Sequence, residues 1–200
     1  MQEIPVFEGV KGLIFDLDGT IADTMPAHFL AWRNTCQKYG IKFTRDLFME
    51  LAGVPLFQTV RRLNQEFGKN LDPEVVGEEK EKKFLETISQ TRVVEPVVNL
   101  IKKYHGILPM AVGTGGHRDV ARQTLSITGM DQYFDIVVTA DDVTQHKPHP
   151  ETFLECARRM NITPRACQVF EDGLPGFEAA RQAGMKVIDV TTYYEVTIGQ

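Results

Sequence analysis

The chain has 200 residues, of which 42% are hydrophobic and 24% are charged, and its formal net charge is −5. This balance excludes a disordered chain and allows one domain, or a core domain with a smaller insertion. No run of basic residues exceeds two, which argues against a nucleic-acid partner.

The cysteines and the N-terminus indicate where the protein works. Cys36, Cys156 and Cys167 form no CxxC pair, so neither a disulfide scaffold nor a zinc site is expected. Residues 1–9 lack the basic start and apolar run of a signal peptide. No apolar stretch approaches the ~20 residues that span a bilayer. We therefore expect a cytoplasmic protein without a membrane partner.

Short apolar runs that end in polar or glycine residues recur along the chain: residues 10–15, 108–112, 134–138, 169–170 and 187–190. Such runs are typical of buried strands in a parallel sheet. Segments with helical spacing lie between them. One of these segments is expected to bury a stripe of four residues: Leu174, Phe177, Ala180 and Ala183. Strands that alternate with helices predict an α/β fold.

One segment, from residue 24 to residue 92, interrupts this alternation. Phe29, Trp32 and Cys36 have helical spacing there, and Asp72-Pro73 is a typical helix start. No strand is predicted within it. The sequence therefore predicts a Rossmann-like parallel-sheet core domain, residues 1–23 and 93–200, with an inserted all-helical cap, residues 24–92.

Polar residues follow four of the predicted strands: Asp16 and Asp18 the first, Thr114 with Gly115 and Gly116 the second, Lys147 the third, and Glu171 with Asp172 the fourth. Ligands of open parallel sheets bind at the carboxyl ends of the strands, so these residues are expected to converge. Asp-Gly-Thr is also a common turn composition, but matching acids at another strand end make a simple turn the weaker interpretation.

The charges of these residues predict a metal ion. Four carboxylates beside one lysine cannot all stay ionised in a dry site, because like charges a few ångströms apart repel. Oxygen ligands without histidine or cysteine favour Mg²⁺. Thr114, with the amides that follow it before a helix, is suited to hold a phosphate group.

In this order, the motifs resemble those of the haloacid dehalogenase superfamily: Asp16-Leu17-Asp18-Gly19-Thr20, Thr114, Lys147-Pro148 and Glu171-Asp172-Gly173. The resemblance runs from about residue 10 to residue 190, and the helical insertion is similar to the family's cap. Within the superfamily, the chain is most similar to the subgroup of β-phosphoglucomutase and fructose-1-phosphatase-like sugar phosphatases. The resemblance therefore implies a phosphatase that acts on a small phosphorylated metabolite such as fructose 1-phosphate.

The resemblance also implies a role for each motif residue. Asp16 would attack phosphorus, and Asp18 would serve as general acid and base. Thr114 and Lys147 would stabilise charge on the phosphate. Asp16, the carbonyl of Asp18, Asp172 and Glu171 would hold Mg²⁺. The expected substrate contacts are Thr20, His28, Trp32, Gly53, Gly115 and Gly116, and the expected assembly is a monomer or a weak homodimer.

Alternatives stay open at this stage. His28 and Trp32 are four apart on one helix, and core packing explains either of them equally well. A mutase of the subgroup grips a second phosphate with cations where Ala52 and Leu56 stand here, which favours the phosphatase, although Arg61 or Arg62 offers a substitute. Two rival interpretations are a phospho-accepting receiver domain and a member of the dehalogenase branch. Neither has an acid that corresponds to Asp18, so the presence of Asp18 favours a phosphatase over both.

Overall fold

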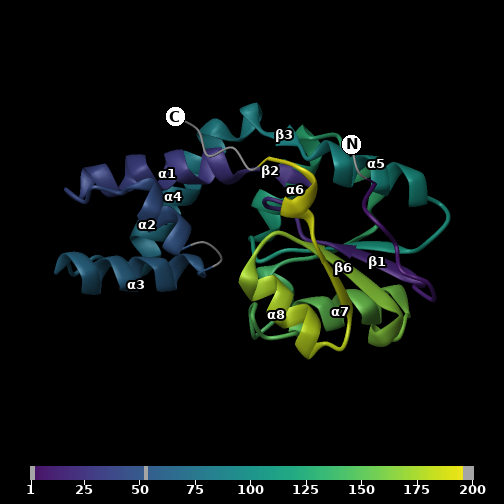
Figure 1. Cartoon of the computed structure of the whole chain (residues 1–200). Helices are drawn as coiled ribbons and strands as arrows, with labels where there is room; N and C mark the ends of the chain where they lie inside the picture. Colours follow the sequence, from purple (N-terminus) through teal and green to yellow (C-terminus); the bar gives the residue numbers. More distant parts are fainter. Residues whose placement is uncertain (1–2, 52–53, 196–200) are drawn as a thin grey trace. The chain divides into compact units, whose positions relative to one another are not determined.

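The computed structural model describes residues 3–51 and 54–195 (Figure 1). Two compact units are present. One extends up to Asp23 and resumes at Arg92, and the other is Thr24–Thr91. The predicted α/β fold with a helical segment inserted after the first strand is confirmed.

A five-stranded parallel sheet forms the centre of the first unit, in the order β5-β4-β1-β6-β7. The strands are β1 (Gly12–Phe15), β4 (Met110–Gly113), β5 (Ile136–Val138), β6 (Cys167–Glu171) and β7 (Lys186–Asp189). Each lies within two residues of a predicted apolar run. β1, β4 and β6 are entirely buried, as expected for strands covered on both faces.

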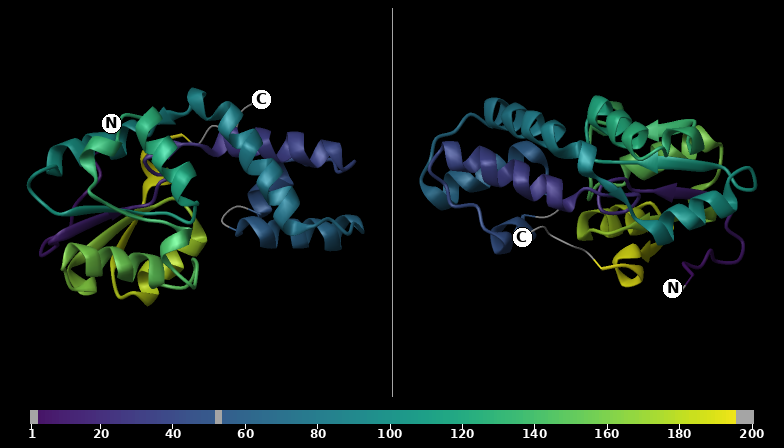
Figure 2. Two further views of the ribbon diagram at one scale, coloured as in Figure 1. Left: turned by 180° about the vertical axis from the view of Figure 1, so that it is seen from behind. Right: turned by 90° about the horizontal axis from the view of Figure 1, so that it is seen from above.

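Helices cover both faces of this sheet (Figures 1 and 2). On one face, Phe15, Val112 and Phe170 pack with α5 (Glu95–Tyr104) and α6 (Arg118–Ile127). On the other, Ile14 and Val169 pack with α7 (Glu151–Met160) and α8 (Leu174–Gln182). Alternate strand residues therefore enter opposite cores, and ligands of such open parallel sheets bind at the carboxyl ends of the strands.

The described residues of the second unit form four α-helices and a short 3-10 helix: α1 (Met25–Lys38), α2 (Arg45–Glu50), α3 (Leu56–Phe67), α4 (Pro73–Thr87) and η1 (Ile88–Gln90). Phe29, Phe48 and Leu63 belong to its shared hydrophobic core. Thr44 caps α2 by accepting a hydrogen bond from the Leu47 amide at 3.2 Å. Asp72 caps α4 in the same way, at the start predicted from Asp72-Pro73.

A two-stranded antiparallel sheet stands where the chain leaves and re-enters the first unit. It pairs β2 (Ala22–Asp23) with β3 (Arg92–Val93). This small sheet was not predicted from the sequence, because a strand of two residues is too short to show the alternation that identifies a strand.

One part of the predicted core was wrong. Leu174 is 80% exposed, although it was assigned to a buried stripe of α8. Residues spaced by three drift around a helix, because three residues turn it by only about 300°. The residues that α8 buries are Gly176, Ala179 and Ala180.

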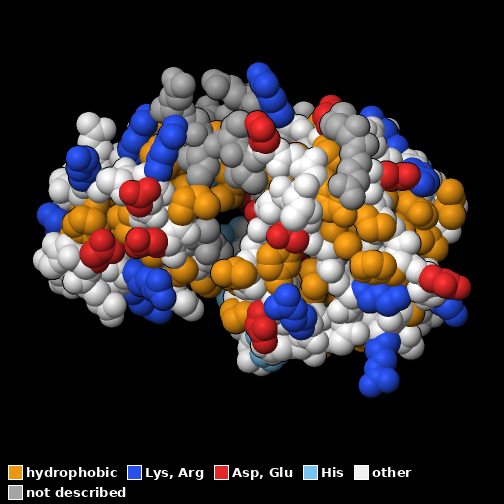
Figure 3. All heavy atoms as spheres, in the orientation of Figure 1, with side chains coloured by type: hydrophobic (Ala, Val, Ile, Leu, Met, Phe, Trp, Pro, Cys, Tyr) orange, Lys and Arg blue, Asp and Glu red, His pale blue; other side chains and the backbone are white. Residues whose placement is uncertain are grey.

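The surface is mixed in charge. On the face in Figure 3, basic and acidic side chains are interspersed among apolar ones over the described residues. No helix among residues 3–51 and 54–195 is long and apolar enough to cross a membrane.

Candidate active site

The predicted strand-end residues meet at the carboxyl edge of the sheet. The Asp16 amide donates to the Phe170 carbonyl at 3.0 Å, and the Thr114 amide donates to the Val138 carbonyl at 2.9 Å. Asp16 and Thr114 are thereby fixed by strand-like hydrogen bonds beyond the ends of β1 and β4. Both residues are buried.

Lys147 joins the two acidic motifs. Its Nζ donates to Oδ1 of Asp16 at 2.6 Å and to Oε1 of Glu171 at 2.8 Å. The same Nζ lies 4.5 Å from the ring centroid of Phe153, which favours a cation. Burial alone would lower the pKa of Lys147, but the Asp16 and Glu171 carboxylates outweigh it and raise that pKa. Lys147 is therefore a fixed positive charge beside Asp16.

The carboxylates of this edge exceed the positive charge available to them. One oxygen from each of Asp16, Glu171 and Asp172 lies within 4.8 Å of the others. Burial, opposed by Lys147 and reinforced by Glu171 and Asp18, raises the pKa of Asp16 from 3.8 to about 7. Burial, reinforced by Glu171 and Asp16 and opposed by Lys147, also raises the pKa of Asp172. A buried oxygen cluster that is short of positive charge fits a hard divalent cation such as Mg²⁺.

Glu171 accepts more hydrogen bonds than Asp16 or Asp172. Besides Lys147, it accepts hydrogen bonds from the amides of Asp172 at 2.7 Å and Gly173 at 2.6 Å, both on Oε2. A Cβ on Gly176 would lie 1.7 Å from its Oε1, so this carboxylate occupies space that only a glycine leaves open. Glu171 thus orients Lys147, while the carboxylates of Asp16 and Asp172 accept fewer hydrogen bonds.

Asp18 lies close to the Thr114–Gly116 loop. Its Oδ2 is 3.7 Å from the position that a Cβ on Gly116 would take. The Gly116 amide donates to Oγ1 of Thr114 at 3.0 Å, and Gly115 is exposed. A second carboxylate therefore stands beside the loop predicted to hold a phosphate group.

The turn after Asp18 packs against Asp172. Gly19 has a φ of +85°, and a Cβ there would lie 2.1 Å from Oδ2 of Asp172. Thr20, which is completely buried, donates from Oγ1 to Oδ1 of Asp172 at 3.3 Å. Its hydroxyl thus contacts a candidate metal ligand, a contact not anticipated from the sequence.

The remaining predicted site residues belong to the helical unit. His28 stacks on Phe84 with ring centroids 4.1 Å apart, and its Nδ1 lies 2.9 Å from Nζ of Lys80. Trp32 is only 7% exposed and stacks on Phe43. Both side chains therefore have packing roles in this unit, and their role as substrate contacts stays a prediction. Gly53 and Ala52 lie outside the described residues.

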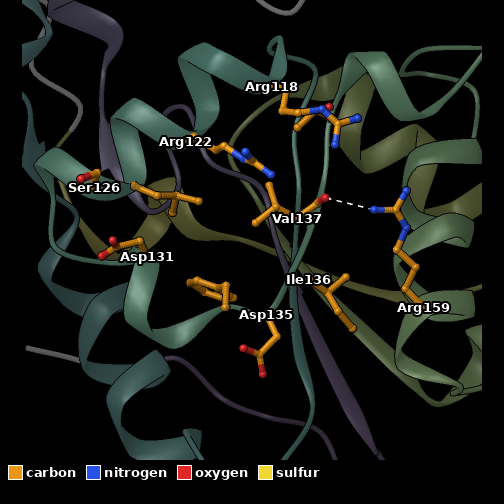
Figure 4. Close-up of a pocket in the computed structure, with 11 residues that line it drawn as sticks. Arg118, Arg122, Ser126, Asp131, Asp135, Ile136, Val137 and Arg159 are labelled. Carbon is orange, nitrogen blue, oxygen red and sulfur yellow. Dashed lines mark hydrogen bonds between the residues drawn. The ribbon is translucent and has the colours of Figure 1, made fainter.

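A separate cavity of about 540 Å³ lies beside β5, between α6 and α7 (Figure 4). Arg118 and Arg159 line it, and both donate to Oδ1 of Asp142, at 3.0 and 2.8 Å. Arg159 also donates to the Val137 carbonyl at 3.2 Å, the dashed line of Figure 4. Neither Asp16 nor Lys147 lines this cavity, so it is distinct from the acidic cluster.

Comparison with known proteins gives consistent similarities. The family model of haloacid dehalogenase-like hydrolases matches residues 13–190. Fructose-1-phosphate phosphatase YqaB of Escherichia coli (strain K12) is 43% identical over 188 residues, which cover 92% of this chain and 98% of that protein. A phosphorylated carbohydrates phosphatase of Thermotoga maritima is 32% identical, covering 90% of this chain and 84% of that protein. A crystal structure of β-phosphoglucomutase from Clostridium difficile has a TM-score of 0.79 at 27% identity, covering 90% of this chain and 84% of that one.

Proposed function

The chain belongs to the haloacid dehalogenase-like hydrolase family and is a phosphatase of that family. We propose that it releases phosphate from a small phosphorylated sugar. The observation that supports this function best is the position of Lys147, whose Nζ contacts both Asp16 and Glu171. A buried nucleophile beside a fixed cation suits attack on a negatively charged phosphate ester.

The proposed reaction has two steps. In the first, a carboxylate oxygen of Asp16 forms a bond to phosphorus while the bond between phosphorus and the sugar oxygen breaks. Asp18 gives its proton to that leaving oxygen. In the second step, water attacks phosphorus, Asp18 takes a proton from the water, and the bond between Asp16 and phosphorus breaks. Inorganic phosphate leaves, and both carboxyl groups return to their starting states.

Other residues of the chain bind and orient the phosphate group. Lys147 and the Thr114 hydroxyl are proposed to neutralise and hold its oxygens, together with the amides of Gly115 and Gly116. Asp16, Asp172 and the carbonyl of Asp18 are the proposed ligands of Mg²⁺. When bound, Mg²⁺ would supply positive charge that offsets the acids and the incoming phosphate. Glu171 is proposed to act on Lys147 and, through water, on the metal.

Fructose 1-phosphate is the first substrate to test. The Escherichia coli relative is named for this substrate, and the similarity extends over nearly the whole length of both chains. The Thermotoga maritima relative is named for phosphorylated carbohydrates in general. A sugar phosphate is therefore proposed as the substrate class.

The similarity to the β-phosphoglucomutase structure supports a second candidate, a phosphomutase. Such an enzyme has to bind both phosphates of a bisphosphate, which calls for cations outside the site described above. Leu56 is apolar and packs against the core of the helical unit, which disfavours this candidate. Arg61 and Arg62 are exposed on α3 and leave it open to test.

A phosphate-release screen tests the proposal. Hexose, pentose and triose phosphates are incubated with Mg²⁺ and one of three proteins: the wild type, Asp16→Asn, or the control Asp119→Asn, whose residue is exposed on α6. We expect release by the wild type and the control, and a loss on the order of 10³-fold or more in Asp16→Asn. Equal activity of Asp16→Asn and Asp119→Asn would contradict the assignment of Asp16 as the nucleophile. Conversion of β-glucose 1-phosphate with a bisphosphate primer, at a rate above hydrolysis, would establish the mutase instead.

A further inference from the structure

The C-terminal segment of the described chain touches the turn of the first motif. Tyr194 follows β7 and the short helix η5 (Val190–Tyr193), and its hydroxyl donates a hydrogen bond to the Gly19 carbonyl, 175 residues away in sequence. Its half-buried side chain packs against the hydrophobic core that includes Leu17 and Ile21. The tyrosine thus reaches the active-site turn from the side of the core.

The turn that Tyr194 contacts is tightly constrained. The Gly19 amide donates to the Ala22 carbonyl at 2.8 Å, and its φ of +85° excludes most side chains. Asp172 fills the space on one side of Gly19, with its Oδ2 2.1 Å from the position of a Cβ there. The Tyr194 hydroxyl orients the Gly19 carbonyl, which belongs to the peptide group that joins Gly19 to Thr20.

Two candidate functional groups depend on where this turn lies. Asp18 directly precedes Gly19, so a displacement of the Gly19 backbone would also displace the carbonyl and the carboxylate of Asp18. Thr20 directly follows, and its hydroxyl donates to Asp172 at 3.3 Å. A displacement of the Gly19 backbone would therefore shift both the proposed general acid, Asp18, and the Thr20 hydroxyl, which contacts a candidate metal ligand.

We propose that Tyr194 is a positioning residue that holds the Asp18–Thr20 turn in its active geometry through the Gly19 carbonyl. This inference rests on the proposed function of Asp16 and Asp18. Tyr194 transfers no proton and contacts no reacting atom in it. The phenol acts like the outer partners of metal ligands, whose loss typically lowers activity or metal affinity ~10–100-fold.

The test compares two neighbouring tyrosines. Tyr194→Phe removes only the hydroxyl that contacts Gly19 and keeps the packed ring. Tyr193→Phe is the matched control, since Tyr193 also packs against this core and its hydroxyl makes no hydrogen bond to the described residues. We measure kcat and KM for fructose 1-phosphate, Mg²⁺ affinity by calorimetry without substrate, and thermal midpoints, with kinetics well below those midpoints.

The expected result is a ~10–100-fold loss in kcat or in Mg²⁺ affinity for Tyr194→Phe, with little change in Tyr193→Phe. A lowered thermal midpoint with unchanged kcat and Mg²⁺ affinity would overturn the proposal, because it would mean a purely structural role. Equal kcat and equal Mg²⁺ affinity of the two variants would overturn it as well. If the wild type hydrolyses no phosphate ester, the proposed function fails on that result alone, and the calorimetric comparison still decides whether Tyr194 organises the metal-binding turn.

Discussion

Glu171 and Gly176 approach so closely that a single methyl group on Gly176 would lie 1.7 Å from Oε1 of the carboxylate. The same oxygen accepts the hydrogen bond from Lys147. The lysine beside Asp16 is therefore held in place by a carboxylate whose own position depends on a glycine of α8.

We predict that Gly176→Ala impairs the site although residue 176 has no chemical role. The new methyl group forces Glu171 to move and Lys147 to lose a partner, so kcat should fall ~10–100-fold. Overpacking should lower the free energy of unfolding by ~1–3 kcal/mol. Gly173→Ala is the matched comparison, because its Cβ would lie an ordinary 3.6 Å from Oε2 of Glu171. Equal kcat values for the two variants would show that Glu171 does not need this space.

A second prediction concerns Asp18, and it uses a substrate whose leaving group needs no proton. With p-nitrophenyl phosphate, Asp18→Asn should release nitrophenolate rapidly in the first turnover and then stall. The reason is that the variant has no base to activate water against the phosphoaspartate. Steady turnover should fall by ~10²–10⁴-fold. Rapid-quench kinetics measure the burst, and mass spectrometry detects the phosphorylated chain.

The Asp16→Asn variant provides the control for that experiment. It should give neither a burst nor a phosphorylated chain. A burst in Asp16→Asn, or undiminished steady turnover in Asp18→Asn, would refute the assignment of the two acids.

The pH dependence of stability provides a third prediction, made for the metal-free protein. Burial raises the pKa of Asp16 to about 7, whereas in an unfolded chain an aspartate ionises near ~4. Between these values the folded protein binds more protons than the unfolded chain, so the free energy of unfolding falls as pH rises. The loss is complete above the folded pKa and amounts to at most a few kcal/mol.

Thermal midpoints of the wild type and Asp16→Asn, measured without metal across this pH range, test the titration. The variant lacks the titrating group, so its midpoint relative to that of the wild type should rise between pH ~4 and ~7. Added Mg²⁺ should stabilise the wild type above that range more than the variant. A midpoint difference that is independent of pH would contradict the raised pKa of Asp16.

The helical unit allows a fourth prediction that involves stability alone. Thr35 is buried in α1, and its Oγ1 has no hydrogen-bond partner among the described residues. Thr35→Val, which replaces the hydroxyl with a methyl group of similar size, should raise the free energy of unfolding by about 1 kcal/mol. Thr59 is equally buried, but its hydroxyl donates to the Val54 carbonyl at 3.3 Å, so Thr59→Val should be destabilising. Denaturant titration measures both, and changes of the same sign would contradict this account.

The strands of the parallel sheet and the acids at their ends were predictable, because both follow from local pattern and from the geometry of parallel sheets. Buried apolar runs identified the strands, and the parallel sheet brings the segments that follow β1 and β5 to one edge, where Lys147 contacts Asp16. The interior of α8 was harder to predict, since a spacing of three residues does not keep Leu174 and Ala180 on one helix face. The local pattern of apolar residues indicates whether a helix or a strand forms. The angular position of each residue around a helix decides which side chains are buried.

Two positioning contacts could not be predicted, for different reasons. Tyr194 meets Gly19 across 175 residues, and no periodicity in the sequence reports so distant a pairing. The contact of Gly176 left a weak signal in the sequence. A glycine inside a helix that follows an acidic motif suggests that another group approaches the helix closely at that position. The sequence does not say which group, and only the positions of β6 and α8 identify Glu171.

The antiparallel pair formed by β2 and β3 has a consequence for how such a protein evolves. Asp23 and Arg92 are register partners, so the chain departs from the α/β unit and returns to it at adjacent points. The residues between Asp23 and Arg92 are therefore a single insertion between two paired strands. Insertions, deletions or wholesale exchange of that stretch leave the strand order, and with it the meeting of Asp16, Lys147 and Glu171, unaltered. The chemistry and the inserted helices can therefore diversify at separate rates within one gene.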